Sequence, residues 1–400
     1  MKKLRAFAAE GPVPLFVAVG QGWAAAVEDL CLSSAIARAA TPRHASILLV
    51  AGDVRPTDRE ALRLLHDQMP HPRATLWWGS TSSDHTGVAA ALNADDDPLP
   101  LLRSLYRRLL LGELASEDHL LPDGPPAPWR GRGEHGQGGD GMMGGTPYGR
   151  PMAMTDDDLR DGLALDACTV EVGPFLPALP PGLVLEIELQ GDVIQRARVI
   201  QSAYPPSSIG SAGAAAHLAV PGVAHRLRCI AAVLSLQQLP AQAELCRRLA
   251  MDIARCTAMR LPDLRRILQC AGAFAAIPPE LGRIEPALAS SLGAIGLTAR
   301  DRMHRWVDEV ELAAQVAQPP APARGATAPN SGTSRALTHE PIQDGRLPFL
   351  FTDLLTGLEW GEALLVIASF DASALWRMSP TADAAALPDS HREHAMAHGR

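Results

Sequence analysis

The residues best suited to metal or redox chemistry in this chain are its cysteines. They are Cys31, Cys168, Cys229, Cys246, Cys256 and Cys270. No two of them stand in a Cys-x-x-Cys pair, the spacing through which a short loop supplies two thiolates to one metal or cluster. Four of the six lie in a segment that we predict to be helical, where a cysteine is typically a small buried apolar residue. We therefore expect free thiols rather than metal ligands.

A glycine pair after the first predicted strand is the next candidate for a ligand site. Gly20-Gln-Gly22 resembles the start of a dinucleotide-binding turn, but the third glycine of that motif is missing. The nearest acidic residue after the next strand, Asp53, follows about 30 residues later, whereas the motif places it about 20 residues on. A tight turn between a strand and a helix explains the glycines better than a nucleotide site does.

The glycine-rich stretch 131–151 contains Glu134, His135 and Asp140. So many glycines leave potential metal ligands unpositioned, because ordering glycine costs more backbone entropy than ordering any other residue. We expect a loop that orders on contact with a partner. The sequence has no Ser/His/Asp or Cys/His arrangement that indicates an activated nucleophile. It therefore assigns no catalytic, cofactor-binding or metal-binding residue.

Composition excludes several classes of protein. The net charge of −8 argues against a nucleic-acid-binding surface, which needs an excess of Lys and Arg. No window has the roughly 18 uninterrupted apolar residues of a membrane span. The start of the chain does not have the pattern of a signal peptide, so we expect a cytoplasmic protein without disulfides.

The first part of the chain predicts alternating strands and helices. Short apolar runs at 14–20, 46–51 and 74–78 are typical of strands buried on both faces of a parallel sheet. Helical spacing follows at 23–39, 58–68 and 99–114. This pattern favours a doubly wound, flavodoxin-like α/β domain.

The remainder of the chain predicts a small β-hairpin element and then an α-helical domain. Apolar and polar residues alternate from Leu185 to Gln190, Gly191-Asp192 forms a turn, and a second strand begins at Val193. Thr155 and the acidic run 156–158 are typical of a helix start. Helical patterns cover 241–255 and 261–276, and another helix ends near Val316.

These patterns divide the chain into six segments. They are an α/β domain at 1–118, a Gly/Pro-rich linker loop at 119–155, the hairpin and helical domain at 156–316, a flexible linker at 317–340, a C-terminal helical segment at 341–380 and a disordered tail at 381–400.

Two stretches resemble known families. Gly173-Pro-Phe-Leu-Pro177 before the hairpin resembles the Gly-Pro-x-His-Pro turn of the quinone-pocket subunit of respiratory complex I and of the large subunit of nickel–iron hydrogenases. The stretches 41–54 and 64–73, followed by Trp78-Gly-Ser80, resemble the iron–sulfur (small) subunit that carries the terminal cluster in the same enzymes. The chain is thus similar to a fusion of these two subunits.

The resemblance comes without the ligands of either family. The loops at 20–30, 79–84 and 95–100, where the small subunit has cluster ligands, contain no cysteine, and Cys31 lies more than a helical turn beyond the expected pair. Leu176 stands in place of the histidine, and none of Tyr106, Tyr148 and Tyr204 matches the family's quinone tyrosine. We therefore expect neither an iron–sulfur cluster nor a nickel–iron centre.

The resemblance implies a subunit of a membrane-associated assembly related to complex I and to energy-converting hydrogenases. Its partners would be antiporter-like membrane subunits and other peripheral subunits, and it would lie on the cytoplasmic side of the inner membrane without a transmembrane segment of its own. The predicted role is structural or regulatory. One alternative is a redox-active subunit of NADH–quinone oxidoreductase type that interacts with quinone. Another is a small nucleotide-binding α/β protein.

Overall fold

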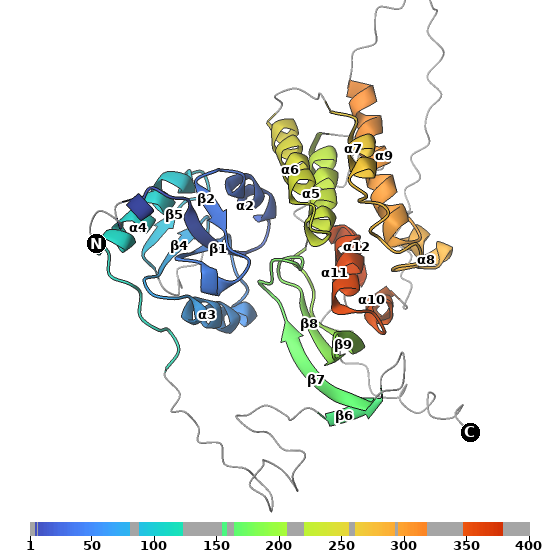
Figure 1. Cartoon of the computed structure of the whole chain (residues 1–400), viewed down its shortest axis with the longest axis horizontal. Helices are drawn as coiled ribbons and strands as arrows, with labels where there is room; N and C mark the ends of the chain where they lie inside the picture. Colours follow the sequence, from blue (N-terminus) through green and yellow to red (C-terminus); the bar gives the residue numbers. More distant parts are fainter. Residues whose placement is uncertain are drawn as a thin grey trace, which may run out of the picture.

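The computed structural model folds the chain into two units that pack against each other (Figure 1). It describes residues 5, 7–80, 88–122, 154–157, 164–205, 220–255, 261–292, 295–317 and 347–378. The first unit contains the described residues up to 122, and the second unit contains those from 154 onward. The predicted loop at 131–151, most of the linker at 317–340 and the tail at 381–400 lie outside the described residues.

The first unit is built on a parallel five-stranded sheet. Its strands are β1 (Val13–Val19), β2 (Ile36–Arg38), β3 (Ile47–Ala51), β4 (Ala74–Trp78) and β5 (Ala90–Leu92), and its helices are α2 (Ala24–Cys31), α3 (Arg59–Gln68) and α4 (Pro98–Leu111). The spatial order is β2-β1-β3-β4-β5. The order reverses between β1 and β3, and in such sheets a crevice opens there at the carboxyl ends of the strands.

Both faces of this sheet are covered, as the apolar runs predict. Helices α2 and α4 pack on one face, through Val27, Leu102 and Leu105. Helix α3 packs on the other through Leu62, and Phe175 of the second unit joins that core. All five residues of β3 and of β4 are buried, which explains why these strands lack polar alternation.

The second unit begins with an antiparallel sheet in the order β6-β7-β8-β9. Its strands are β6 (Met154–Asp157), β7 (Ala164–Val172), β8 (Val184–Gln190) and β9 (Val193–Gln201). The predicted hairpin is β8–β9, turning at Gly191 with φ +64°. Leu185, Ile187 and Ile194 on its inner face are buried against the helices.

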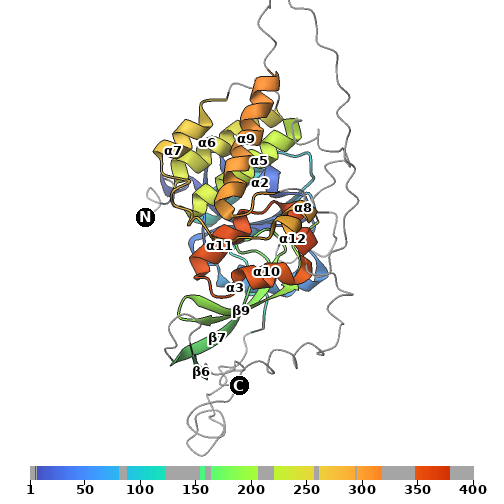
Figure 2. The same ribbon diagram turned by 90° about the vertical axis from the view of Figure 1, so that its right-hand side faces the viewer.

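The helices of the second unit form one apolar core with the inner face of the hairpin (Figure 2). They are α5 (Val220–Leu236), α6 (Pro240–Ala254), α7 (Leu264–Cys270), α8 (Pro286–Ser291), α9 (Ala299–Ala317), α10 (Leu347–Leu355), α11 (Trp360–Ala368) and α12 (Ala372–Met378). The last three return to the hairpin, where the Ile194 N–H donates to the Leu358 carbonyl at 2.9 Å.

Two local predictions are wrong. The pattern at 23–39 predicts a single helix, but helix α2 ends at Cys31. Ile36–Arg38 is instead an edge strand that pairs with β1. Thr155 and the acids after it do not start a helix, because Met154–Asp157 pairs with β7 as strand β6. In both cases a neighbouring strand supplies the backbone hydrogen-bond partners, and tertiary pairing outweighs local propensity.

Candidate functional site

A polar latch holds the two units together, and it starts at the carboxyl end of β3. Arg55 donates to the Ser202 carbonyl at 2.8 Å and to the Ala203 carbonyl at 3.1 Å, and its guanidinium lies 4.2 Å from the ring centroid of Tyr204. The Tyr204 hydroxyl donates to buried Asp58 at 3.1 Å, and Gln201 donates to the same carboxylate at 2.7 Å. Burial and the Asp58 charge raise the pKa of Tyr204, so its hydroxyl keeps its proton.

A second polar contact joins α2 to α5. Arg228 on α5 donates to Asp29 at 2.9 Å and lies 3.4 Å from a carboxylate oxygen of Glu28. Burial raises the pKa of Glu28, and the nearby arginines Arg247, Arg228 and Arg38 oppose that rise. At this edge of the interface, several guanidinium groups therefore surround a carboxylate whose pKa is raised by burial.

Trp23 fills the crevice over the carboxyl ends of β3 and β4, beside the switch point of the parallel sheet. A Cβ built on Gly52 would lie 2.1 Å from the Trp23 ring, and one on Gly79 would lie 2.0 Å from it. The ring also packs edge-on against Trp78, with the ring centroids 4.7 Å apart. The glycines after β3 and β4 thus make room for an indole.

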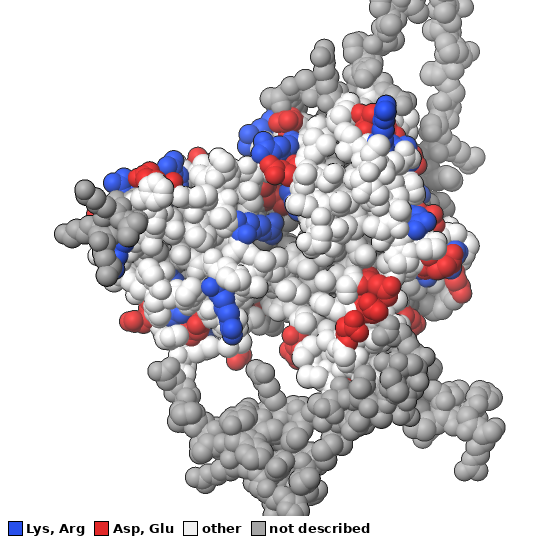
Figure 3. Space-filling model, viewed as in Figure 1, with Lys and Arg blue, Asp and Glu red and all other residues white. Residues whose placement is uncertain are grey.

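Between the two units lies a cavity of about 590 Å³, which we call the interface cavity. The first unit contributes β1, the loop after it, α2 and the end of β2 at Arg38. The second unit contributes the loop 174–181, residues 203–205, α5, the end of α6, α11 and α12. Figure 3 shows the hollow between the units, with charged side chains gathered along part of its edge. Its volume and its position between two units are those of typical small-molecule sites.

Only some of the residues that the sequence analysis discussed line this cavity. Leu176, in the histidine position, is 36% exposed and lines the cavity, and so does Gly20 of the first expected ligand loop. Tyr204 lines it too, but its hydroxyl is already bound in the latch. Tyr106 is buried on α4. Tyr148, Glu134 and His135 lie outside the described residues.

The thiols are spread through the structure. Burial raises the pKa of Cys229 and of Cys246 to about 12 each, and also raises the pKa of Cys31. Cys229 lines the interface cavity, whereas Cys256 lies outside the described residues. Within the described ranges, no three His, Cys, Asp or Glu side chains come together as a metal site requires. A four-iron cluster needs four thiolates, and the residues around Trp23 do not fit one.

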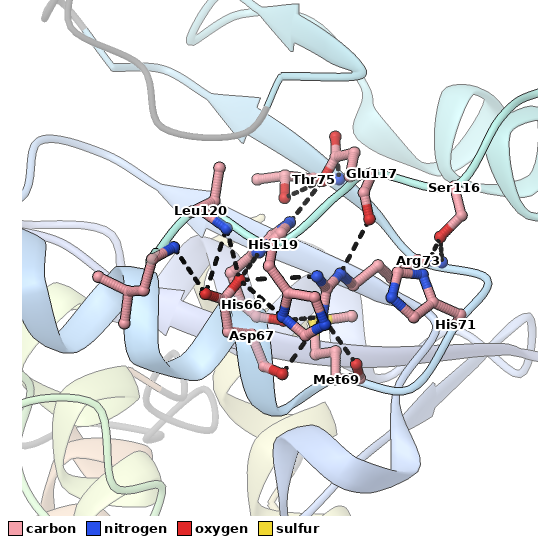
Figure 4. Close-up of polar contacts among 11 residues, drawn as sticks. His66, Asp67, Met69, His71, Arg73, Thr75, Ser116, Glu117, His119 and Leu120 are labelled. Atoms are coloured by element: carbon pink, nitrogen blue, oxygen red, sulfur yellow. Dashed lines mark hydrogen bonds and ion pairs between the residues drawn. The ribbon is translucent and has the colours of Figure 1, made fainter. Parts of the chain in front are cut away.

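A polar network at the opposite end of the first unit was not foreseen from the sequence (Figure 4). Buried His66 lies 2.8 Å from Asp67 and 3.0 Å from Glu117, and Glu117 also accepts from the Thr75 hydroxyl at 2.7 Å. Asp67 accepts from the Leu120 backbone N–H at 2.9 Å. These contacts hold the segment after α4 against the start of β4 and the end of α3, so we interpret the network as structural.

Sequence reasoning also missed Arg55 and Asp58. Their only signal is their position just after a buried strand, where polar residues of doubly wound folds gather. Their partners in the second unit lie more than 120 residues away in the chain, so no local pattern connects them.

The chain matches no protein-family model, no curated protein and no solved structure. Among the described residues, no helix combines the length and the apolar run needed to cross a membrane.

Proposed function

We propose that this chain is a structural or regulatory subunit of a membrane-associated assembly related to complex I and to energy-converting hydrogenases. In this proposal it combines a flavodoxin-like small-subunit unit with a shortened large-subunit unit. It has kept the surfaces through which the two subunits associate and has lost the redox ligands. It acts on the cytoplasmic side of the inner membrane, bound to antiporter-like membrane subunits.

The observation that carries the proposal is the indole of Trp23. It fills the crevice beside the loops where the resemblance expects cluster ligands, and Gly52 and Gly79 accept it closely. Filling the crevice with an aromatic ring stabilises the fold without a metal, since a buried aromatic side chain contributes substantial apolar area. The strand order β2-β1-β3-β4-β5 agrees with a flavodoxin-like unit.

The latch supports the fusion part of the proposal. Arg55, Asp58 and Tyr204 exchange hydrogen bonds across the two units, and Phe175 packs in the core beneath the parallel sheet. Joining two such units in one chain raises their effective concentration, so the interface forms without a separate association step.

Affinity purification of the tagged protein from detergent-solubilised membranes tests this function. We expect a multi-span protein with an antiporter-like sequence in the purified complex, and we expect no stoichiometric iron or acid-labile sulfide. A variant carrying Arg55→Ala should recover less of the partner if the arrangement of the units forms the docking surface. Purification of the chain alone from membranes, or a visible charge-transfer band, would contradict the proposal.

The interface cavity favours a second candidate function, in which the chain hosts a quinone that another subunit reduces. The cavity has a suitable volume and mostly apolar walls, although Leu176 cannot donate a hydrogen bond to a carbonyl. Titration with decylubiquinone, followed by quenching of tryptophan fluorescence, tests this candidate. Saturable quenching would support it, and a flat titration would dismiss it.

A further inference from the structure

The interface cavity has apolar walls over most of its extent. Phe175 and Leu179 line it from the loop 174–181, and Ile367 and Phe370 line it from the C-terminal helices. From the first unit, Val17 and the small side chain of Ala25 face it. Such walls favour a hydrocarbon chain, because removing apolar surface from water contributes about 25 cal/mol per Å².

The charged groups of the cavity lie at one edge. Glu28, Arg38 and Arg228 line it there, and Asp29 and Arg247 stand behind them. Three guanidinium groups therefore lie near two carboxylates, and Arg228 is ion-paired with both of these. His225, one turn before Arg228 on α5, also lines the wall, while Asp371 near it is paired with Arg226 at 2.7 Å. The edge formed by Arg38 and Arg228 thus keeps an excess of positive charge.

Two polar groups at this edge are incompletely bonded. A carboxylate oxygen of Glu28, Oε2, is buried and has no hydrogen-bond partner among the described residues, although Nε of Arg228 lies 3.4 Å from it in an ion pair. Nε of Arg247 is also buried without a hydrogen-bond partner among these residues. No salt bridge within the described ranges involves Arg38, whose side chain is exposed at the rim. Arg38 is therefore the guanidinium group at this edge that an incoming anion can reach without displacing a paired carboxylate.

We propose that the interface cavity binds a single-chain amphipathic carboxylate, such as a medium- or long-chain fatty acid. The ligand's carboxylate binds Arg38 at this positively charged edge, and its chain lies between α2 and the loop 174–181. This goes beyond the proposed function, because it needs only this chain and no membrane partner. A bound chain contacts both units at once and therefore stabilises their association, which is a means of regulation.

The charge pattern distinguishes this ligand from others of similar size. A cationic amphiphile would bring like charge to Arg38 and Arg228. A neutral alcohol or quinone would lose the charge-assisted hydrogen bond to a guanidinium. We therefore expect carboxylates to bind at least about tenfold more tightly than alcohols or amines of the same chain length, since about 1.4 kcal/mol corresponds to tenfold.

The test is a fluorescence titration of the full chain with dansyl-labelled undecanoic acid, followed by displacement. We expect saturable binding, displacement by dodecanoate, and displacement by dodecanol and dodecylamine only at about tenfold higher concentration. Arg38→Gln should raise Kd about tenfold, whereas Arg38→Lys should recover most of the affinity. Ala25→Trp, which fills the cavity from the exposed face of α2, should abolish binding.

Arg43→Gln is the matched control, because Arg43 is also exposed on the first unit but does not line the cavity. Each variant must show the wild-type unfolding temperature before its Kd is compared. The proposal is overturned if the probe does not bind, or if Arg38→Gln binds it like the wild type. It is also overturned if decylubiquinone displaces the probe as well as dodecanoate does, which would instead favour the quinone candidate. None of these results depends on recovering a membrane partner.

Discussion

The crevice of the parallel sheet and the interface cavity are both places where a protein of this architecture can hold a ligand, but only one is open. Trp23 closes the crevice, and its ring lies where any Cβ on Gly52 or Gly79 would stand. The interface cavity, which shares the loop after β1 with the crevice, keeps a volume of about 590 Å³. We therefore expect a ligand to bind between the two units rather than in the crevice of the first unit, which the Trp23 ring occupies.

The Gly79→Ala substitution tests whether Trp23 fills the crevice, and we expect it to lower the free energy of unfolding more than the other substitutions do. Gly79 has φ +68°, and its Cβ would overlap the Trp23 ring, so backbone strain and overpacking add. We expect the free energy of unfolding to fall by about 3 kcal/mol in urea titrations. Gly112→Ala is the matched control, because Gly112 has φ +77° with nothing near its Cβ, and it should cost only about 1 kcal/mol. Equal losses at the two positions would show that Trp23 does not fill the crevice.

Arg55→Ala tests the interface and should have the next largest effect. The change removes the donors to the Ser202 and Ala203 carbonyls and the contact with Tyr204. We expect a loss of about 2 kcal/mol and, in calorimetry, a single transition that divides into two as the units uncouple. The exposed Arg63 on α3 provides a control, and Arg63→Ala should change stability by less than about 0.5 kcal/mol. A sharp single transition in Arg55→Ala would contradict a role in joining the units.

Two acids should respond to pH with opposite signs. Burial alone would raise the pKa of Glu117, but hydrogen bonds from His66 and Thr75 lower it, so its stabilisation is present at neutral pH and is lost as pH falls through the folded-state pKa. Burial raises the pKa of Glu28, so the folded state loses stability as pH rises from the unfolded-state pKa through the folded-state pKa.

Glu117→Gln should therefore destabilise the protein by about 1 kcal/mol at neutral pH, and the difference should shrink in acid. Glu28→Gln should remove the loss on raising pH, so this variant gains stability relative to the wild type as pH rises. Urea titrations at several pH values from acid to neutral measure both. The same sign of pH dependence for both variants would contradict the different environments assigned to the two acids.

Leu176→His should have the smallest effect. Leu176 is 36% exposed at the mouth of the interface cavity, and the change restores the histidine of the resembled turn. We expect a change in stability within about 0.5 kcal/mol, as for most partly exposed positions. We also expect no gain in quinone binding, because a single donor does not supply the second polar contact. Tight decylubiquinone binding by this variant, measured by fluorescence, would favour descent from a quinone site still competent to bind.

The parts of the fold that could be predicted from the sequence are those with a strong local pattern. The runs at 47–51 and 74–78 are buried on both faces and so carry no polar interruption, and the hairpin turn at Gly191 requires positive φ. Strands β2 and β6 could not be predicted, because Ile36–Arg38 and Met154–Asp157 are set by their pairing with β1 and β7.

The candidate site was less accessible from sequence. Glu28 on α2 and Arg38 on β2 belong to the first unit, and Arg228 joins them only when α5 packs on α2, which their positions in the chain do not indicate. The role of Trp23 was hidden for a related reason. In the sequence, Trp23 is simply an apolar residue after a strand. The glycines that contact its ring, Gly52 and Gly79, come close to it only in the folded structure.

A crystal structure of the anaerobically purified full chain, grown with dodecanoate, shows at once what occupies the crevice and what occupies the interface cavity. We expect Trp23 packed over Gly52 and Gly79, and continuous density for a chain in the interface cavity with its carboxylate at Arg38. A structure in which Trp23 has left the crevice, and in which a cluster or a nucleotide lies in its place, would contradict this expectation.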